Sequence, residues 1–171
     1  MELGLTIPLQ RHCKRKVPPR GAEADLRFCW DLHVIPLRGR VSLLAVHCHS
    51  RYAFVLFDLR RPEWDGLERT FFDGLGRSLA AAGVPADATG DYLHRAGAVR
   101  FTGTHGRREV AFLNRAWDDV AALDYCLDPA SREQPLLDHA VNARPSRCVG
   151  FQGLVPAANR LISSLTGAEP T

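Results

Sequence analysis

The sequence predicts an α+β fold in which a mostly antiparallel sheet, a three-stranded meander plus further strands, has helices packed on one face. Residues 28–59 contain three segments rich in Val, Leu, Phe and Tyr that are separated only by short turns. Residues 62–82 and 106–123 instead repeat their apolar side chains every three or four positions, which is the helical period. Strands followed mainly by helices, without regular alternation, are typical of the α+β class.

The meander comprises residues 28–37, 41–49 and 52–59. Its turns fall at residues 38–40 and 50–51, where Arg-Gly-Arg and Ser-Arg interrupt the apolar runs. Because connections this short join antiparallel neighbours, we expect three consecutive antiparallel strands. The middle strand is almost continuously apolar, which predicts burial on both of its faces.

The N-terminal segment predicts a first strand over residues 2–8, followed by a basic run over residues 11–16. Two prolines at 18–19 then break the chain before a loop over residues 20–27. Together with Arg20, the basic run could contact phosphates. A solvated loop is the simpler alternative, because no aromatic side chains alternate with the charges to stack on bases.

The remaining predicted elements alternate between helix and strand. The helix over residues 62–82 begins at Pro62, a residue favoured in the first helical turn, and ends before a glycine. A shorter helix over residues 86–95 follows, and then a fourth strand over residues 98–104. The helix over residues 106–123 has a single apolar stripe, which predicts packing against the sheet.

Length and composition predict one domain over residues 1–171, with a core over about residues 2–125 and a helical extension over about 126–165. The last predicted elements are short helices over 136–141 and 157–165 and a frayed tail over 167–171. No segment reads as a linker or a repeat.

Five scattered cysteines without a CxxC pair predict free thiols and a cytoplasmic location, not a disulfide scaffold or a zinc ribbon. No run approaches the roughly 18 apolar residues of a membrane span, so we expect no membrane partner. The net charge of +3 permits a nucleic-acid or phosphorylated partner without requiring one. Because no nucleophile elbow, Walker motif or paired acids stand out, we assign no catalytic residues and leave enzymatic activity open.

The strongest candidate site is the loop that joins the predicted strand 98–104 to the predicted helix 106–123. A helix N-terminus presents unpaired N–H groups and a partial positive charge, and arginine binds phosphate through two N–H groups. The candidate anion-binding residues are Thr104, His105, Arg107, Arg108, Asn114 and Arg115. The alternative is structural, because Gly106 and Glu109 form a serviceable N-cap pairing and exposed arginines are common on helices.

A candidate metal site depends on the register of the first hairpin. A three-residue turn at residues 38–40 would place a thiol, a carboxylate and three imidazoles on one face, which suits zinc. A two-residue turn would split this set, because a register shift of one residue reverses every side chain. The set is Cys29, Asp31, His33, His47 and His49. Since half-buried histidines are common at strand ends, we assign no metal and no cofactor.

Two groups of short motifs stand out in the sequence. The first is Cys29-Trp30-Asp31-Leu32-His33, Arg38-Gly39-Arg40, Leu43-Leu44-Ala45-Val46 and Arg51-Tyr52, and the second is Thr102-Gly103-Thr104-His105-Gly106-Arg107 with Leu113-Asn114-Arg115-Ala116. Over about residues 2–125, they resemble a bacterial family of unknown function. Its members stand alone or precede SEC-C-type zinc motifs or plasmid- and transposon-passenger domains.

The resemblance bears on both candidate sites. It implies histidine in family members where this chain has Asp31, and asparagine where it has His47, so the hairpin metal set would be particular to this chain. The second group of motifs fits the family better, which favours the anion-binding loop. The neighbouring domains imply a link to mobile elements, and this is an inference by analogy.

We therefore interpret the chain as a nucleic-acid or phosphorylated-ligand binding module, linked to mobile elements through the resemblance. Arg107, Arg108 and Arg115 would hold phosphate, and binding would weaken with salt. One alternative is a protein–protein interaction module without a small-molecule site, with an exposed apolar patch around residues 150–165. Another is a phosphoester hydrolase, in which His105 acts as general acid or base and Arg107 stabilises charge.

Overall fold

The computed structural model describes residues 1–21, 23, 25–148 and 150–166. The predicted tail over 167–171 and two positions of the predicted loop over 20–27 lie outside the described residues. The strands are β1 (Glu2–Leu5), β2 (Cys29–Leu37), β3 (Arg40–His47), β4 (Ala53–Leu56), β5 (Arg100–Gly103), β6 (Pro145–Ser146) and β7 (Val155–Pro156). The helices are α1 (Ile7–His12), α2 (Arg61–Asp65), α3 (Leu67–Ala81), α4 (Ala86–Ala96), α5 (Arg107–Ala122), α6 (Pro135–Asn142) and α7 (Ala157–Thr166). None of these helices combines the length and the apolar character needed to cross a membrane.

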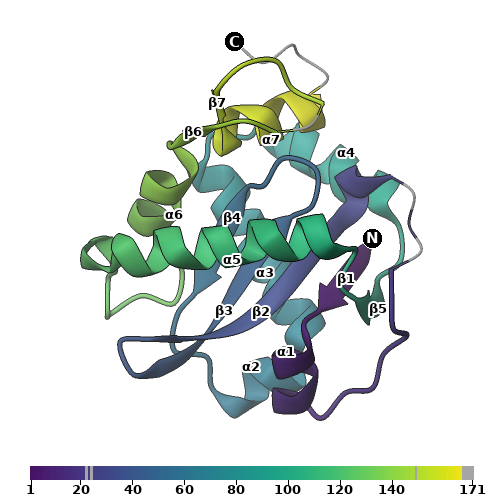
Figure 1. Ribbon diagram of the computed structural model, residues 1–171, viewed down its shortest axis with the longest axis vertical. Coiled ribbons are helices and arrows are strands. Elements are labelled where there is room, and N and C mark those ends of the chain that lie inside the picture. The colour runs from purple at the N-terminus through teal and green to yellow at the C-terminus, as the bar shows by residue number, and fades with distance from the viewer. Residues whose placement is uncertain (22, 24, 149, 167–171) are drawn as a thin grey trace.

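The main sheet has five strands in the order β4-β3-β2-β1-β5, and it is mixed. The prediction of a mostly antiparallel sheet was therefore wrong. β2, β3 and β4 form the predicted antiparallel meander, but β1 lies between β2 and β5 and runs parallel to both (Figure 1). The cause is the length of the connections. The chain passes through α1 between β1 and β2, and through α2, α3 and α4 between β4 and β5, and such crossovers permit parallel pairing.

Helices cover both faces of this sheet, so the prediction of helices on one face was also wrong. Figure 1 shows α5 crossing in front of the sheet and α3 lying behind it. Strand β3 shows why both layers are needed. Leu43 and Ala45 belong to the apolar cluster with α3, α4 and α7, whereas Leu44 and Val46 belong to the cluster with α5 and α6. A strand that is apolar on both faces must be covered on both.

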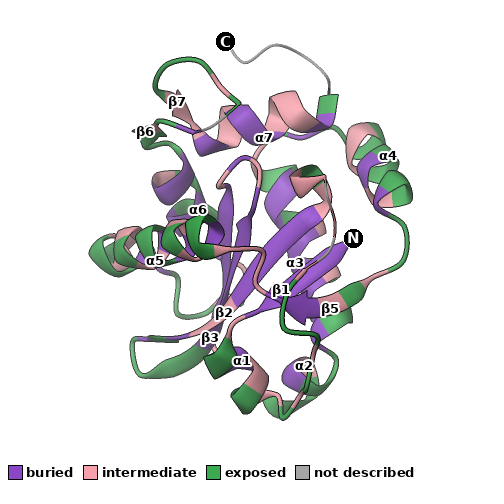
Figure 2. Ribbon diagram, turned by 45° about the vertical axis from the view of Figure 1, so that its right-hand side comes forward, coloured by how far each residue is buried: buried purple, intermediate pink, exposed green. Residues whose placement is uncertain are grey.

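The burial pattern agrees with this three-layer arrangement. In Figure 2 the strands of the main sheet are buried over most of their length, and the exposed residues lie on the outer sides of the helices. The turn between β2 and β3 is the exposed end of the sheet. The core is thus divided by the sheet into two clusters of buried apolar side chains.

Two predicted elements begin or end elsewhere in the structure. The helix predicted over residues 62–82 is two helices, α2 and α3, which meet at Gly66, where the backbone leaves the helical conformation (φ −97°, ψ 38°). The strand predicted over residues 2–8 ends at Leu5, because α1 begins at Ile7 with Pro8 in its first turn, where proline is favoured. The start of the basic run over residues 11–16 therefore belongs to a helix.

The free edge of β4 is completed by side chains of α6. Asn142 Oδ1 accepts a hydrogen bond from the N–H of Ala53 (2.8 Å), and Asn142 Nδ2 donates to the carbonyl of the same residue (2.6 Å). Asp138 Oδ1 accepts from the N–H of Val55 (3.0 Å). The N–H and C=O of Ala53 and the N–H of Val55, which an edge strand would otherwise leave unpaired, are thus satisfied by one helix.

Candidate functional site

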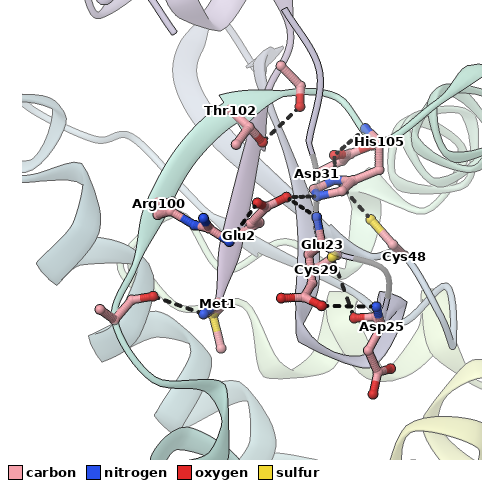
Figure 3. Close-up of polar contacts among 12 residues, drawn as sticks. Met1, Glu2, Glu23, Asp25, Cys29, Asp31, Cys48, Arg100, Thr102 and His105 are labelled. Atoms are coloured by element: carbon pink, nitrogen blue, oxygen red, sulfur yellow. Dashed lines mark hydrogen bonds and ion pairs between the residues drawn. The ribbon is translucent and has the colours of Figure 1, made fainter. Parts of the chain in front are cut away.

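The predicted anion-binding loop joins β5 to α5 as expected, but its histidine turns inward. His105 Nδ1 lies 2.7 Å from Asp31 Oδ1, and Nε2 lies 3.3 Å from Glu2 Oε2 (Figure 3). The exposed fraction of the His105 side chain is 2%. Burial lowers the pKa of His105, but its hydrogen bonds and the charges of Asp31 and Glu2 outweigh burial and raise the pKa above its usual value. Both ring nitrogens therefore face carboxylates inside the protein, and not the solvent from which an anion would bind.

The arginines at the start of α5 do not form a common site with His105. Arg107 is exposed, and Arg108 forms an ion pair with Glu109 (Nη2 to Oε1, 2.8 Å). A Cβ added at Gly106 would lie 2.8 Å from Glu109 Oε2, so this buried carboxylate lies against the residue that precedes the helix. The structure describes all six candidate residues, and no hydrogen bond or ion pair between any two of them is present.

Two of the six candidates do lie on one side of α5. Arg108, Phe112 and Arg115 are spaced four and three residues apart, which places their side chains on the same helix face. The guanidinium carbon of Arg108 is 5.8 Å from the centre of the Phe112 ring. Phe112 and Arg115 both line a groove that runs beside this face. Asn114 is exposed on α5 and does not line it.

The groove lies between α5, α6 and the β6 strand, with the start of α7 contributing to its wall. Its volume is about 740 Å³, which is within the range of small-molecule sites. The charged residues that line it are Arg51, Arg115, Arg144, Arg160, Asp118 and Asp119. Four cations against two carboxylates leave the groove with an excess of positive charge, as a site for anions requires.

Arg51 is positioned in this groove by the turn between β3 and β4. Its backbone has φ 64°, a conformation that residues other than glycine rarely adopt. The guanidinium carbon lies 3.7 Å from the centre of the Phe112 ring, a close cation–π contact. Its Nε is buried and has no hydrogen-bond partner among the described residues. The guanidinium is thus held by an aromatic ring and not by a carboxylate, so its charge is not compensated locally.

Arg160 and Arg144 have structural partners. Arg160 is fully buried, and its guanidinium donates to the carbonyls of Ser50 (2.8 Å), Ser146 (2.8 Å) and Val155. Burial lowers the pKa of Arg160. Because these donors are engaged, Arg160 ties the β3–β4 turn to β6 and β7 and contributes only its charge to the groove. Arg144 forms an ion pair with Asp119 of α5.

The hairpin register separates the predicted metal set. Leu37 pairs with Arg40, so the turn has two residues, and Trp30 pairs with His47. His47 therefore shares a face with Trp30, and Asp31 lies on the other face. His47 bonds instead to Ser50 Oγ (Nδ1, 2.7 Å), and burial lowers its pKa to about 4. The five-residue set on one face, expected from a three-residue turn, does not form.

The basic run over residues 11–16 lies at the end of the sheet away from β6 and α6, as Figure 1 shows for α1. Within it, the guanidinium carbon of Arg15 is 4.5 Å from the centre of the Phe101 ring, and Nη2 of Arg15 donates to the carbonyl of Asp65 (3.4 Å). The run is therefore partly held by contacts within the chain and is separate from the groove.

A family model for a domain of unknown function, DUF6933, matches residues 2–155. The chain belongs to this family. A comparison with curated proteins gave no match. The DUF6933 match extends beyond the residue 125 limit of the motif resemblance and includes Arg51, Arg115 and Arg144, whereas Arg160 follows it.

Sequence reasoning missed three arginines and one aromatic residue of the groove in this DUF6933 chain, namely Arg51, Arg144, Arg160 and Phe112. The spacing of Arg108, Phe112 and Arg115 was a readable signal of a basic face with a central aromatic ring. Arg51 and Arg144 lie in turns far from α5 in the sequence, and only the packing of α5 and α6 on one face of the sheet brings them together.

Proposed function

We propose that this protein is a binding module for a phosphate-bearing ligand, a nucleotide or single-stranded nucleic acid, and that the ligand lies in the groove beside α5. The observation that carries the proposal is the environment of Arg51 and Arg115. Both line the groove, and neither forms an ion pair with a described residue. Arginine binds phosphate through its planar fork of N–H groups, and its guanidinium plane also stacks on bases.

The alternatives have less support. His105, the acid–base group of the hydrolase hypothesis, is buried between carboxylates, while Arg107 is exposed at the start of α5. For the protein-interaction module, the large exposed apolar side chains are spread over several elements and include Leu136 on α6 and Leu154 before β7. We also propose a cytoplasmic location, because all five cysteines are free. The link to mobile elements stays a prediction.

The test is a salt series of binding to labelled single-stranded DNA and RNA, duplex DNA and nucleotides, measured by fluorescence anisotropy. Arg115→Ala should weaken single-strand binding, and it should lower the slope of log K against log salt by about 0.7, the value of one phosphate contact on a single strand. Arg69→Ala is the matched control, because Arg69 is an exposed arginine of α3 that does not line this groove.

Two results would contradict the proposal. The first is that no phosphate-bearing probe binds at low salt, and the second is that Arg115→Ala and Arg69→Ala have the same effect. In the second case the binding would be a property of the overall positive charge and not of the groove. An Arg51→Lys variant adds a finer test, because it keeps the charge but removes the planar group stacked on Phe112.

A further inference from the structure

A second cluster of chemical groups lies at the N-terminal ends of β1 and β2 and in the loop after β5. In the parallel register, Glu2 pairs with Cys29 and Gly4 pairs with Asp31. Because side chains alternate along a strand, these four residues share one face, opposite the face of Leu3 and Trp30. His105 from the loop and Cys48 from the end of β3 complete the cluster (Figure 3).

The interior of the cluster is dense in groups that bind metals. Asp31 Oδ1 and Cys48 Sγ both approach the same atom, His105 Nδ1, at 2.7 and 3.6 Å. Asp31 and Cys48 are 1% and 2% exposed. A Cβ added at Gly4 would lie 2.1 Å from Asp31 Oδ1 and 3.0 Å from His105 Nδ1, so the absence of a side chain at Gly4 allows both atoms to lie where they do.

We propose that Asp31 Oδ1, Cys48 Sγ and His105 Nδ1 bind a Zn²⁺ ion. One oxygen, one sulfur and one nitrogen form a donor set that zinc accepts, whereas calcium and magnesium require oxygen. Zinc–ligand distances with tetrahedral angles place a nitrogen and a sulfur about 3.6 Å apart. The observed separation of His105 Nδ1 and Cys48 Sγ is 3.6 Å, and the Asp31–His105 pair would open by about 0.7 Å to admit the ion.

Glu2 would act as the positioning residue for this ion. Its Oε2 lies 3.3 Å from His105 Nε2 and accepts a hydrogen bond from the backbone N–H of Glu23 (3.0 Å). Its Oε1 is 3.2 Å from Arg100 Nη2. A histidine that donates one ring N–H to a carboxylate presents the other nitrogen to a metal, and this arrangement recurs around protein-bound zinc.

The same cluster offers another possible position on the opposite side of the ring, between Glu2, Cys29 and His105 Nε2. We place the ion at Nδ1 because both oxygens of Glu2 already have partners, Arg100 and the backbone of Glu23. Among the described residues, the Asp31 carboxylate has only the imidazole and long contacts to the backbone N–H of His105, 3.3 and 3.4 Å.

The charges are consistent with a dication. Glu2, Asp31 and a Cys48 thiolate carry three negative charges, and Arg100 with a Zn²⁺ ion balances them. Such an ion would join β2, the end of β3 and the loop before α5, and its fourth coordination position would be left for a water molecule. The site differs from the hairpin set considered from the sequence, since it shares only Asp31 with that set.

The test uses the full chain, stripped of metal with a chelator and titrated with Co²⁺, both as native protein and during refolding. We expect one Co²⁺ per chain, with the visible absorption of tetrahedral cobalt and a near-ultraviolet thiolate-to-cobalt charge-transfer band that Zn²⁺ removes. Cys48→Ser should abolish that band and weaken binding at least tenfold. Cys29→Ser is the matched control and should keep both the charge-transfer band and the wild-type affinity for Co²⁺.

The proposal is overturned if Co²⁺ binds in neither form, or if the band survives in Cys48→Ser. Because Cys48 is buried and its variant could fail to fold, X-ray absorption of the zinc-loaded wild-type chain provides an independent measurement. It should detect a single sulfur neighbour at about 2.3 Å. A zinc environment with no sulfur, or with two, would also overturn the assignment.

Discussion

At the scale of single residues, Gly4 has little tolerance for change. A Cβ at this position would meet Asp31 Oδ1 at 2.1 Å, far inside the contact distance, and would push the carboxylate away from His105. We expect Gly4→Ala to lower the free energy of unfolding by about 3 kcal/mol, because it overpacks the site and separates a buried charged pair. Urea unfolding in the presence of a chelator measures this.

Gly76→Ala is the control for that substitution. Gly76 lies within α3, and apart from its chain neighbours and the backbone of its own helix, no described atom lies within 4 Å of a Cβ added there. Alanine should stabilise the helix by about 0.5–1 kcal/mol, so the two glycine variants should change stability in opposite directions. Equal effects of the two substitutions would mean that the space beside Gly4 is not needed by Asp31 and His105.

The same residues show the limit of prediction at this scale. The sequence correctly indicated the loop between β5 and α5 and singled out His105, but it predicted an anion as its partner. Its neighbours within the chain, Glu2 and Asp31, come from two other strands, and their approach depends on a parallel register that no local pattern encodes. Asp31 was noticed only as part of a hairpin set that the two-residue turn divides.

At the scale of elements, the contact between α6 and the edge strand β4 requires the carboxyl group of Asp138 to be buried, which disfavours its ionised form. Asp138 is buried, and burial raises its pKa well above the usual value, although hydrogen bonds from Val55 and Ser78 act in the opposite direction. The folded chain therefore holds a proton that the unfolded chain releases above about pH 4. The stability of the wild type should fall as pH rises from there towards the folded-state pKa.

Asp138→Asn should remove this dependence while keeping the oxygen that accepts from Val55. We expect little difference from wild type near pH 4 and a stabilisation on the order of 1–2 kcal/mol at pH 7–8, measured as thermal midpoints across pH. Asp91→Asn, on the exposed face of α4, is the control, and its thermal midpoints should follow those of the wild type across pH. A stabilisation independent of pH would show that Asp138 is ionised in the folded protein.

Elements were more predictable than their arrangement. The period of apolar residues correctly indicated the three meander strands and α5, because it is a local property of the chain. It does not indicate the neighbours of β1, since insertion between β2 and β5 depends on long connections and not on turn residues. The apolar run of β3 did predict that both faces of the sheet are covered, and this conflicts with the prediction that helices pack on one face only.

At the scale of the whole molecule, the segment after residue 125 contributes to both sides of the sheet. Leu137 and Val141 of α6 lie in the cluster with α5, and Leu161 and Leu165 of α7 lie in the cluster with α3 and α4. If the chain is one domain over residues 1–171, as its length predicts, removal of this segment opens both clusters at once. We expect a chain ending at residue 125 to lack a cooperative unfolding transition.

The full chain should then unfold in one step that two probes report together. Far-UV circular dichroism follows the helices, and tryptophan fluorescence follows both clusters, because Trp30 and Trp64 lie in one and Trp117 packs against the other. Leu161→Ala is a milder change than the truncation. It should lower the free energy of unfolding by about 3 kcal/mol, and the midpoints of the two probes should still coincide. A sharp transition in the chain ending at residue 125, or distinct midpoints for the two probes, would mean that the C-terminal helices fold as a separate unit.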